Sequence, residues 1–103
     1  MLYSNANPIK IRQKFKAALL SKKLQRFPGA FSPLVAQLIE DKEYEGVYIS
    51  GAVVSATLGL PDIGLTTLSE VSAFSRSVCR MTNLPVIADA DTGFGEASNV
   101  ARA

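Results

Sequence analysis

Short apolar segments alternate with segments of helical periodicity along this chain of 103 residues. Residues 46–51 form a glycine-bounded run, rich in β-branched side chains, that is typical of a buried strand. Pro85 opens a second run of this kind, and a further short strand is predicted within residues 24–31, interrupted by Pro28 and Gly29. Strands that alternate with helices predict parallel pairing with right-handed crossover connections.

The helical segments carry start signals and apolar faces. Pro8 suits the first turn of a leading helix, and Ser32 followed by Pro33 predicts the start of a second helix. Thr67 and Glu70 have the spacing of a capping box at the start of a third helix. The positions predicted to face a core are Ile11, Phe15, Ala18 and Leu19 in the first helix, Leu34, Val35, Leu38 and Ile39 in the second, and Leu68, Val71, Phe74 and Val78 in the third.

The predicted order is one helix followed by three strand–helix units. Residues 52–66 are predicted to form a longer connection, and a last helix is predicted to begin near residue 97. Two closures of such an α/β chain are open at this point, a doubly wound sheet and a (β/α)8 TIM barrel, and both bind ligands at the carboxyl ends of the strands. Neither a G-x-G-x-x-G motif nor a P-loop follows the strand at 46–51, which disfavours nucleotide binding.

Composition excludes several kinds of site. The chain is 48% hydrophobic, which excludes a disordered tail. It has no histidine, which excludes Ser-His and Cys-His catalysis and most zinc sites within this segment. Cys79 is the only cysteine, so an internal disulfide is excluded and a reducing compartment is expected. We predict that Cys79 is a small buried packing residue. The sequence contains no membrane-length apolar run or secretion signal, so a cytosolic location is expected.

The net charge of the whole chain is only +2, but its basic residues are concentrated in the first part of the chain. A basic amphipathic helix could touch nucleic acid or a membrane surface, but these charges are not interleaved with an aromatic platform. We therefore interpret them as a solvated face and expect neither nucleic acid nor a membrane as a partner. The basic residues concerned are Lys10, Arg12, Lys14, Lys16, Lys22, Lys23 and Arg26.

Two carboxylates follow the predicted strand that Pro85 opens. Asp89 and Asp91 are two residues apart, a spacing that points both side chains to one face if the strand continues through them. Converging carboxylates stay ionised most easily with a cation between them, and oxygen ligands favour Mg2+ or Mn2+. An ordinary strand-to-helix turn rich in Asp and Gly is the alternative interpretation.

Three motifs in order resemble the isocitrate lyase/phosphoenolpyruvate mutase superfamily, within which the likeness is nearest to the 2-methylisocitrate lyase branch. The resemblance covers roughly residues 10–103. The motifs are Tyr48-Ile49-Ser50-Gly51, then Leu58-Gly59-Leu60-Pro61-Asp62-Ile63-Gly64, then Asp89-Ala90-Asp91-Thr92-Gly93-Phe94-Gly95 with Asn99-Val100-Ala101-Arg102.

The resemblance implies a Mg2+-dependent TIM barrel, with Mn2+ as an alternative metal, that acts on a small 2-hydroxy or 2-oxo acid and forms a homotetramer at full length. In the lyase branch the reaction is carbon–carbon cleavage of 2-methylisocitrate to pyruvate and succinate, in propionate catabolism through the methylcitrate cycle. Members acting on phosphonopyruvate or oxaloacetate are the alternative. The residue roles implied are metal binding by Asp89 and Asp91, a catalytic role for Asp62 in supporting metal and substrate, and substrate binding by Tyr48, Ser50, Gly51 and Ala52.

Two departures from the family pattern bear on activity. Many members carry a second glycine where this chain has Ala52, and the family's lysine- and cysteine-containing catalytic loop is absent from the sequence. A whole TIM barrel needs about 250 residues. Residues 1–103 are therefore expected to be the incomplete N-terminal portion of a single TIM-barrel lyase domain, marginal or aggregating and without lyase activity when isolated; a non-catalytic truncated remnant is the alternative.

Overall fold

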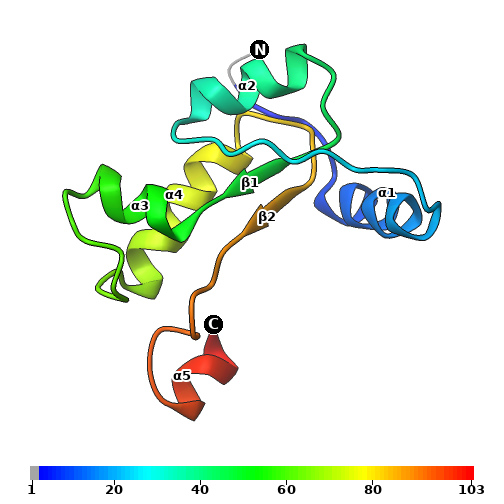
Figure 1. Cartoon of the computed structure of the whole chain (residues 1–103). Coiled ribbons are helices and arrows are strands. Elements are labelled where there is room, and N and C mark those ends of the chain that lie inside the picture. Colours follow the sequence, from blue (N-terminus) through cyan, green and yellow to red (C-terminus); the bar gives the residue numbers. More distant parts are fainter. Residues whose placement is uncertain (1–2) are drawn as a thin grey trace.

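The computed structural model describes residues 3–103 and contains five helices and two strands in its element order. The helices and strands are α1 (Pro8–Leu20), α2 (Pro33–Asp41), β1 (Val47–Ile49), α3 (Gly51–Thr57), α4 (Leu68–Cys79), β2 (Val86–Ala88) and α5 (Ala97–Arg102). Figure 1 shows α2, α3 and α4 along one side of the two strands. In the same view α1 lies near the end at which the strands begin, and α5 lies beyond the end of β2. Within the described residues, none of the helices has both the length and the apolar character needed to cross a bilayer.

The two strands are parallel, as the alternation predicted. Val47 pairs with Val86, Tyr48 with Ile87, and Ile49 with Ala88. Because the pairing is parallel, the carboxyl ends of both strands lie at the same edge of the sheet.

The prediction of a strand within residues 24–31 is wrong. The structure has a single parallel bridge there, between Gly29 and Tyr48. Tyr48 donates its backbone N–H to the Pro28 carbonyl at 2.9 Å, and Ala30 donates to the Tyr48 carbonyl at 3.0 Å. Pro28 has no N–H to extend the ladder, so this segment follows the free edge of β1 for only one bridge.

The predicted helix starts are confirmed in atomic detail. The Asn7 side chain accepts the Ile9 N–H at 2.9 Å, and the Ser32 hydroxyl accepts the Val35 N–H at 3.3 Å. The capping box at α4 is complete, because Thr67 caps the Glu70 N–H while the Glu70 carboxylate accepts the Thr67 N–H. The prediction of a connection over residues 52–66 is wrong in its first half, where α3 lies.

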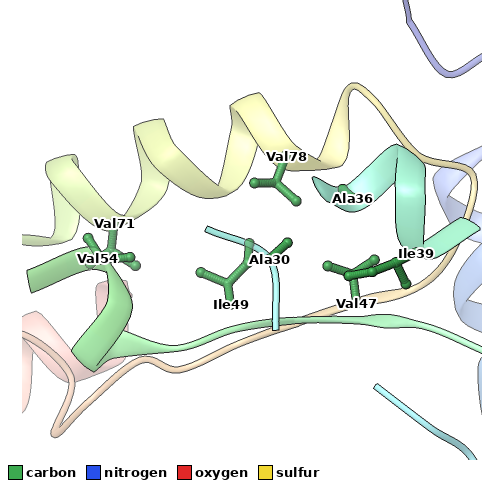
Figure 2. Packing of buried hydrophobic residues seen from close by; sticks show 8 residues of the cluster. All are labelled: Ala30, Ala36, Ile39, Val47, Ile49, Val54, Val71 and Val78. Carbon is green, nitrogen blue, oxygen red and sulfur yellow. The ribbon is translucent and has the colours of Figure 1, made fainter. Parts of the chain in front are cut away.

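The core lies between β1 and the helices α2, α3 and α4. Val47 and Ile49 point from β1 into this layer, where Val71 lies against Val54 and Val78 lies near Ala36 (Figure 2). The intervening Tyr48 points to the opposite face of the strand, as the period of two requires. The buried apolar residues are Ala30, Ala36, Ile39, Val47, Ile49, Val54, Val71 and Val78.

Four predictions of burial are wrong. Leu34 and Leu38 of α2 are 73% and 54% exposed, and Leu19 of α1 is 58% exposed. Cys79 is also exposed rather than a packing residue, because the buried Val78 occupies the inward-facing position at the end of α4. A single apolar stripe predicts which side of a helix is available for packing, but whether another element covers that side depends on the tertiary arrangement.

Candidate functional site

The candidate site lies where the two strands end. β1 runs into Ser50 and Gly51, and β2 runs into Asp89. Asp89 donates its backbone N–H to the Ile49 carbonyl at 2.9 Å, which extends the parallel ladder by one bond. This bond fixes Asp89 beside Gly51, so residues 38 positions apart meet at one edge of the sheet.

The carboxylate of Asp89 is held by backbone amides on both sides. Its Oδ1 accepts the Asp91 N–H at 2.8 Å, and its Oδ2 accepts the Gly51 N–H at 3.4 Å. A β-carbon on residue 51 would lie 2.9 Å from Asp89 Oδ2, closer than real β-carbons come to such atoms. The missing side chain of Gly51 therefore lets the carboxylate reach the start of α3.

Asp91 reaches the site by a route other than the predicted one. The strand ends at Ala88, and Asp91 has φ +48° in a turn closed by its own N–H to Asp89. The expectation that Asp89 and Asp91 share one face of a continuing strand is therefore wrong, since β2 ends at Ala88. The turn still brings Asp91 Oδ2 toward Gly64, 3.6 Å from where a β-carbon would lie on that residue.

Asp62, Asp89 and Asp91 line one open cavity of about 570 Å³. Gly51 and Gly64 contribute backbone to it, so all three sequence motifs meet there. Among the described residues, Tyr48, Ser50 and Ala52 lie outside its lining: Tyr48 is half-buried on β1, Ser50 is the residue before α3, and Ala52 is exposed on α3. The residues of the lining that sequence reasoning did not assign to the site are Ile63, Gly64, Thr66, Val71, Thr92 and Phe94.

Of these unassigned residues, Ile63, Gly64, Thr92 and Phe94 carried a signal in the sequence, since all four belong to the quoted motifs. In the structure Gly64 and Phe94 adopt positive φ, +79° and +63°. A positive φ is uncommon for a residue other than glycine and marks a tightly constrained loop. The position of Val71 on the cavity wall carried no signal in the sequence, because its burial pattern is that of any core residue of α4.

The donors at this edge are oxygen atoms, which suit a hard divalent cation. Asp89 keeps lone pairs beyond those used by the Asp91 and Gly51 amides, and Asp91 is exposed to the cavity. Within residues 3–103, however, no three His, Cys, Asp or Glu residues lie close enough together to enclose a metal. The oxygen donors therefore suit Mg2+, but the described residues would surround the ion only partly.

Three comparisons relate the chain to known proteins. A family profile described as phosphoenolpyruvate phosphomutase matches residues 15–103. The sequence is 56% identical over 102 residues to a probable 2-methylisocitrate lyase 1 of Corynebacterium glutamicum. The alignment covers 98% of this chain and 33% of that protein.

Solved structures agree with the sequence relatives. Phosphonopyruvate hydrolase in complex with oxalate and Mg2+ superposes with a TM-score of 0.82 at 38% identity, covering 87% of this chain and 32% of that one. A 2,3-dimethylmalate lyase, described as a PEP mutase/isocitrate lyase superfamily member, superposes with a TM-score of 0.79 at 31% identity, covering 87% and 33%. The chain spans about a third of the length of the curated relatives it matches. It belongs to the phosphoenolpyruvate mutase/isocitrate lyase superfamily.

Proposed function

We propose that residues 1–103 form the N-terminal portion of a Mg2+-dependent 2-methylisocitrate lyase with a (β/α)8 barrel, which cleaves 2-methylisocitrate to pyruvate and succinate. The single observation that carries this proposal is the meeting of Asp62, Asp89 and Asp91 in one cavity at the carboxyl ends of two parallel strands. The 56% identity with a probable 2-methylisocitrate lyase favours this branch over the phosphonopyruvate-acting one, for which the identity is 38%.

Asp89 and Asp91 are the residues that would hold the metal. The two backbone amides fix Asp89 in one orientation, so less ordering entropy is lost on binding than for a freely rotating carboxylate. A bound Mg2+ supplies Lewis-acid stabilisation of negative charge on substrate oxygens. Mn2+ prefers the same oxygen donors and is the alternative metal.

The remaining residues of the proposed site bind and orient the substrate. Asp62 lines the same cavity as Asp89 and Asp91, where it would support the substrate and the metal's water shell by accepting hydrogen bonds. The start of α3 offers the backbone N–H groups of Ser50 and Ala52 to a substrate carboxylate, while the Gly51 N–H donates to Asp89. Tyr48 points to the face of β1 away from the helices, where a closed barrel has its interior.

Isolated residues 1–103 are expected to have no measurable turnover. The other two thirds of the relatives' length are absent from this sequence, and β2 has an edge that no strand of the described chain pairs. The complete protein is proposed to be a cytosolic homotetramer. A non-catalytic truncated product is the second candidate, and partial coverage of the relatives is the observation that favours it.

A chimera tests the function directly. The chain replaces the aligned third of the Corynebacterium glutamicum relative, and release of pyruvate from 2-methylisocitrate is measured with and without Mg2+. The proposal expects Mg2+-dependent release that Asp89→Asn and Asp91→Asn each reduce at least a hundredfold. A folded chimera that is inactive with 2-methylisocitrate but hydrolyses phosphonopyruvate would move the assignment to the other branch. A folded chimera inactive with both would favour the truncated remnant.

A further inference from the structure

The loop that follows β2 holds its backbone in an uncommon conformation. Three consecutive residues adopt positive φ, with +100° at Gly93, +63° at Phe94 and +148° at Gly95. Glycine accepts such values readily, whereas a residue with a β-carbon and a bulky ring is strained by them. Strain of this kind persists only where the surroundings hold the residue in place, and it gathers at functional sites. The conformation of Phe94 therefore requires a compensating interaction.

That interaction is the packing of the Phe94 side chain against the core. Phe94 is half-buried and packs against the cluster of buried hydrophobic residues. It also lines the cavity that contains Asp62, Asp89 and Asp91. Val71 belongs to the buried cluster and lines the same cavity. Phe94 thus connects the core to the wall of the proposed site.

The glycines on either side of Phe94 allow this arrangement. A β-carbon on residue 93 would lie 2.6 Å from the Val100 side chain of α5, and a β-carbon on residue 95 would overlap the Asn99 side chain. With glycine at both positions, α5 packs directly on the loop while Phe94 stays against the core. All of these contacts are made within the chain itself, so they do not depend on a further strand or helix.

Asp91 lies between two anchors of this loop. On one side, Asp89 Oδ1 accepts the Asp91 N–H at 2.8 Å. On the other side, Gly93 donates its N–H to the Ala90 carbonyl at 2.9 Å and is followed directly by Phe94. Asp91 itself is exposed and has φ +48°. The place of its carboxylate in the cavity therefore depends on both anchors.

We propose, building on the proposed function in which Asp91 binds the metal, that Phe94 is a positioning residue for Asp91. Its ring, packed on the core, keeps the turn over residues 89–93 in the form that presents the Asp91 carboxylate to the cavity. A cation that uses both Asp89 and Asp91 binds more tightly when the second carboxylate is already in place, because less conformational entropy is lost on binding. In this role Phe94 acts through Asp91 and not on the substrate.

Four variants separate the ring from the backbone and from general stability. Phe94→Ala removes the ring and keeps a β-carbon at positive φ, whereas Phe94→Gly removes both the ring and the strain. Phe94→Leu keeps an apolar side chain against the core and is the conservative variant. Phe74→Ala is the matched control, because Phe74 is also half-buried and packed on the same cluster but does not line the cavity.

Two measurements on the chain test the proposal. Amide hydrogen exchange followed by NMR gives the protection of the Asp91 and Gly93 amides relative to that of the Val47 amide in β1, which reports on the sheet. Titration with Mn2+ followed by electron paramagnetic resonance gives the dissociation constant of the ion.

Phe94→Ala and Phe94→Gly are expected to lower the relative protection at least about fivefold and to raise the Mn2+ dissociation constant at least about tenfold. Changes below about threefold in both quantities are expected for Phe94→Leu and for Phe74→Ala. The conservative variant therefore rescues the turn, and the control shows that a loss of core packing alone does not disturb it.

Wild-type relative protection in Phe94→Ala would overturn the proposal, as would equal losses in Phe74→Ala. Wild-type values in Phe94→Gly beside losses in Phe94→Ala would also overturn it, because strain and not the missing ring would then be the cause. Exchange is measured without metal. A chain that binds no Mn2+, or an inactive chimera, would therefore count against the proposed function, whereas the exchange ratio would still support or overturn the role of Phe94.

Discussion

The ring of Phe27 lies directly against the α-carbon of Gly46, in the space that a β-carbon of residue 46 would occupy. Gly46 is buried just before β1, and the segment that contains Phe27 continues to the bridge between Gly29 and Tyr48. The absence of a side chain at position 46 therefore allows residues 27–30 to cover the edge of β1.

Gly46→Ala is expected to lower the free energy of unfolding by about 3 kcal/mol, because the added methyl group must displace an aromatic ring in packed surroundings. The measurement is urea unfolding followed by circular dichroism. Gly29→Ala is the matched control, since its new β-carbon would lie 3.9 Å from the Tyr48 carbonyl oxygen, at ordinary contact distance. Equal unfolding midpoints for the two variants would contradict the role assigned to Phe27.

Gly51→Ala is expected to weaken divalent cation binding at least tenfold, because its β-carbon would push the Asp89 carboxylate away from the start of α3. Titration with Mn2+ followed by electron paramagnetic resonance measures this directly on the chain. Gly59→Ala serves as a control: its β-carbon meets open space, and the strain at its positive φ of +70°, which Gly51 does not have, makes the control the more severe backbone change. Wild-type affinity in Gly51→Ala would show that Asp89 does not need its present position to bind the ion.

Glu40 links α2 to the turn before β2. Its carboxylate accepts the Thr82 hydroxyl at 2.6 Å, the Asn83 N–H at 2.8 Å and the Asn83 side-chain amide at 3.0 Å. Partial burial acts to raise the pKa of Glu40, but these hydrogen bonds outweigh it and the net effect lowers the pKa. The ionised form is therefore the one that stabilises the folded state.

Glu40→Gln is expected to cost about 1–2 kcal/mol at pH 7, where the carboxylate is ionised and its hydrogen bonds are charge-assisted. A lowered folded pKa means that the unfolded chain binds the proton more readily, so this stabilisation is present above the unfolded pKa and is lost as pH falls through the folded pKa. Urea midpoints measured from pH 7 to pH 3 should converge for the two proteins. Glu43→Gln, at an exposed position outside this network, should show a constant small difference.

Arg26 binds Glu45 through both carboxylate oxygens and stacks over the Tyr44 ring at 4.7 Å. The hydrogen bonds from Arg26 lower the pKa of Glu45 to about 2. A carboxyl-detected NMR titration should therefore give a midpoint near this value in the wild type. In Arg26→Gln the midpoint should return toward the ordinary glutamate value of about 4.3, and an unchanged midpoint would exclude Arg26 as the cause.

Local signals in the sequence predicted much of the fold. The predicted caps Ser32 and Thr67 bind groups three residues further along, so the chemistry of each cap is complete within one short segment. The segment from Gly51 to Thr57 was missed as a helix because Ser50 makes no side-chain cap and its β-branched residues favour strands.

The acidic residues of the candidate site were predictable from the sequence, whereas their geometry was not. Asp62, Asp89 and Asp91 were named from motifs, and the structure brings them to one cavity. The turn that gives Asp91 its φ of +48° could not be inferred, because it depends on the Asp89 carboxylate accepting the Asp91 N–H. That carboxylate is in turn held by Gly51, on a distant segment.

The amino-acid order alone was sufficient for the helix starts, the parallel β/α alternation and the acidic character of the strand end, since each depends on neighbours within a few residues. Only the tertiary structure decided that Leu34, Leu38 and Cys79 face solvent and that Gly51 lies against Asp89. Burial and close approach depend on which elements, distant in the sequence, pack against each other. The chemistry of a single residue is compatible with several such packing arrangements.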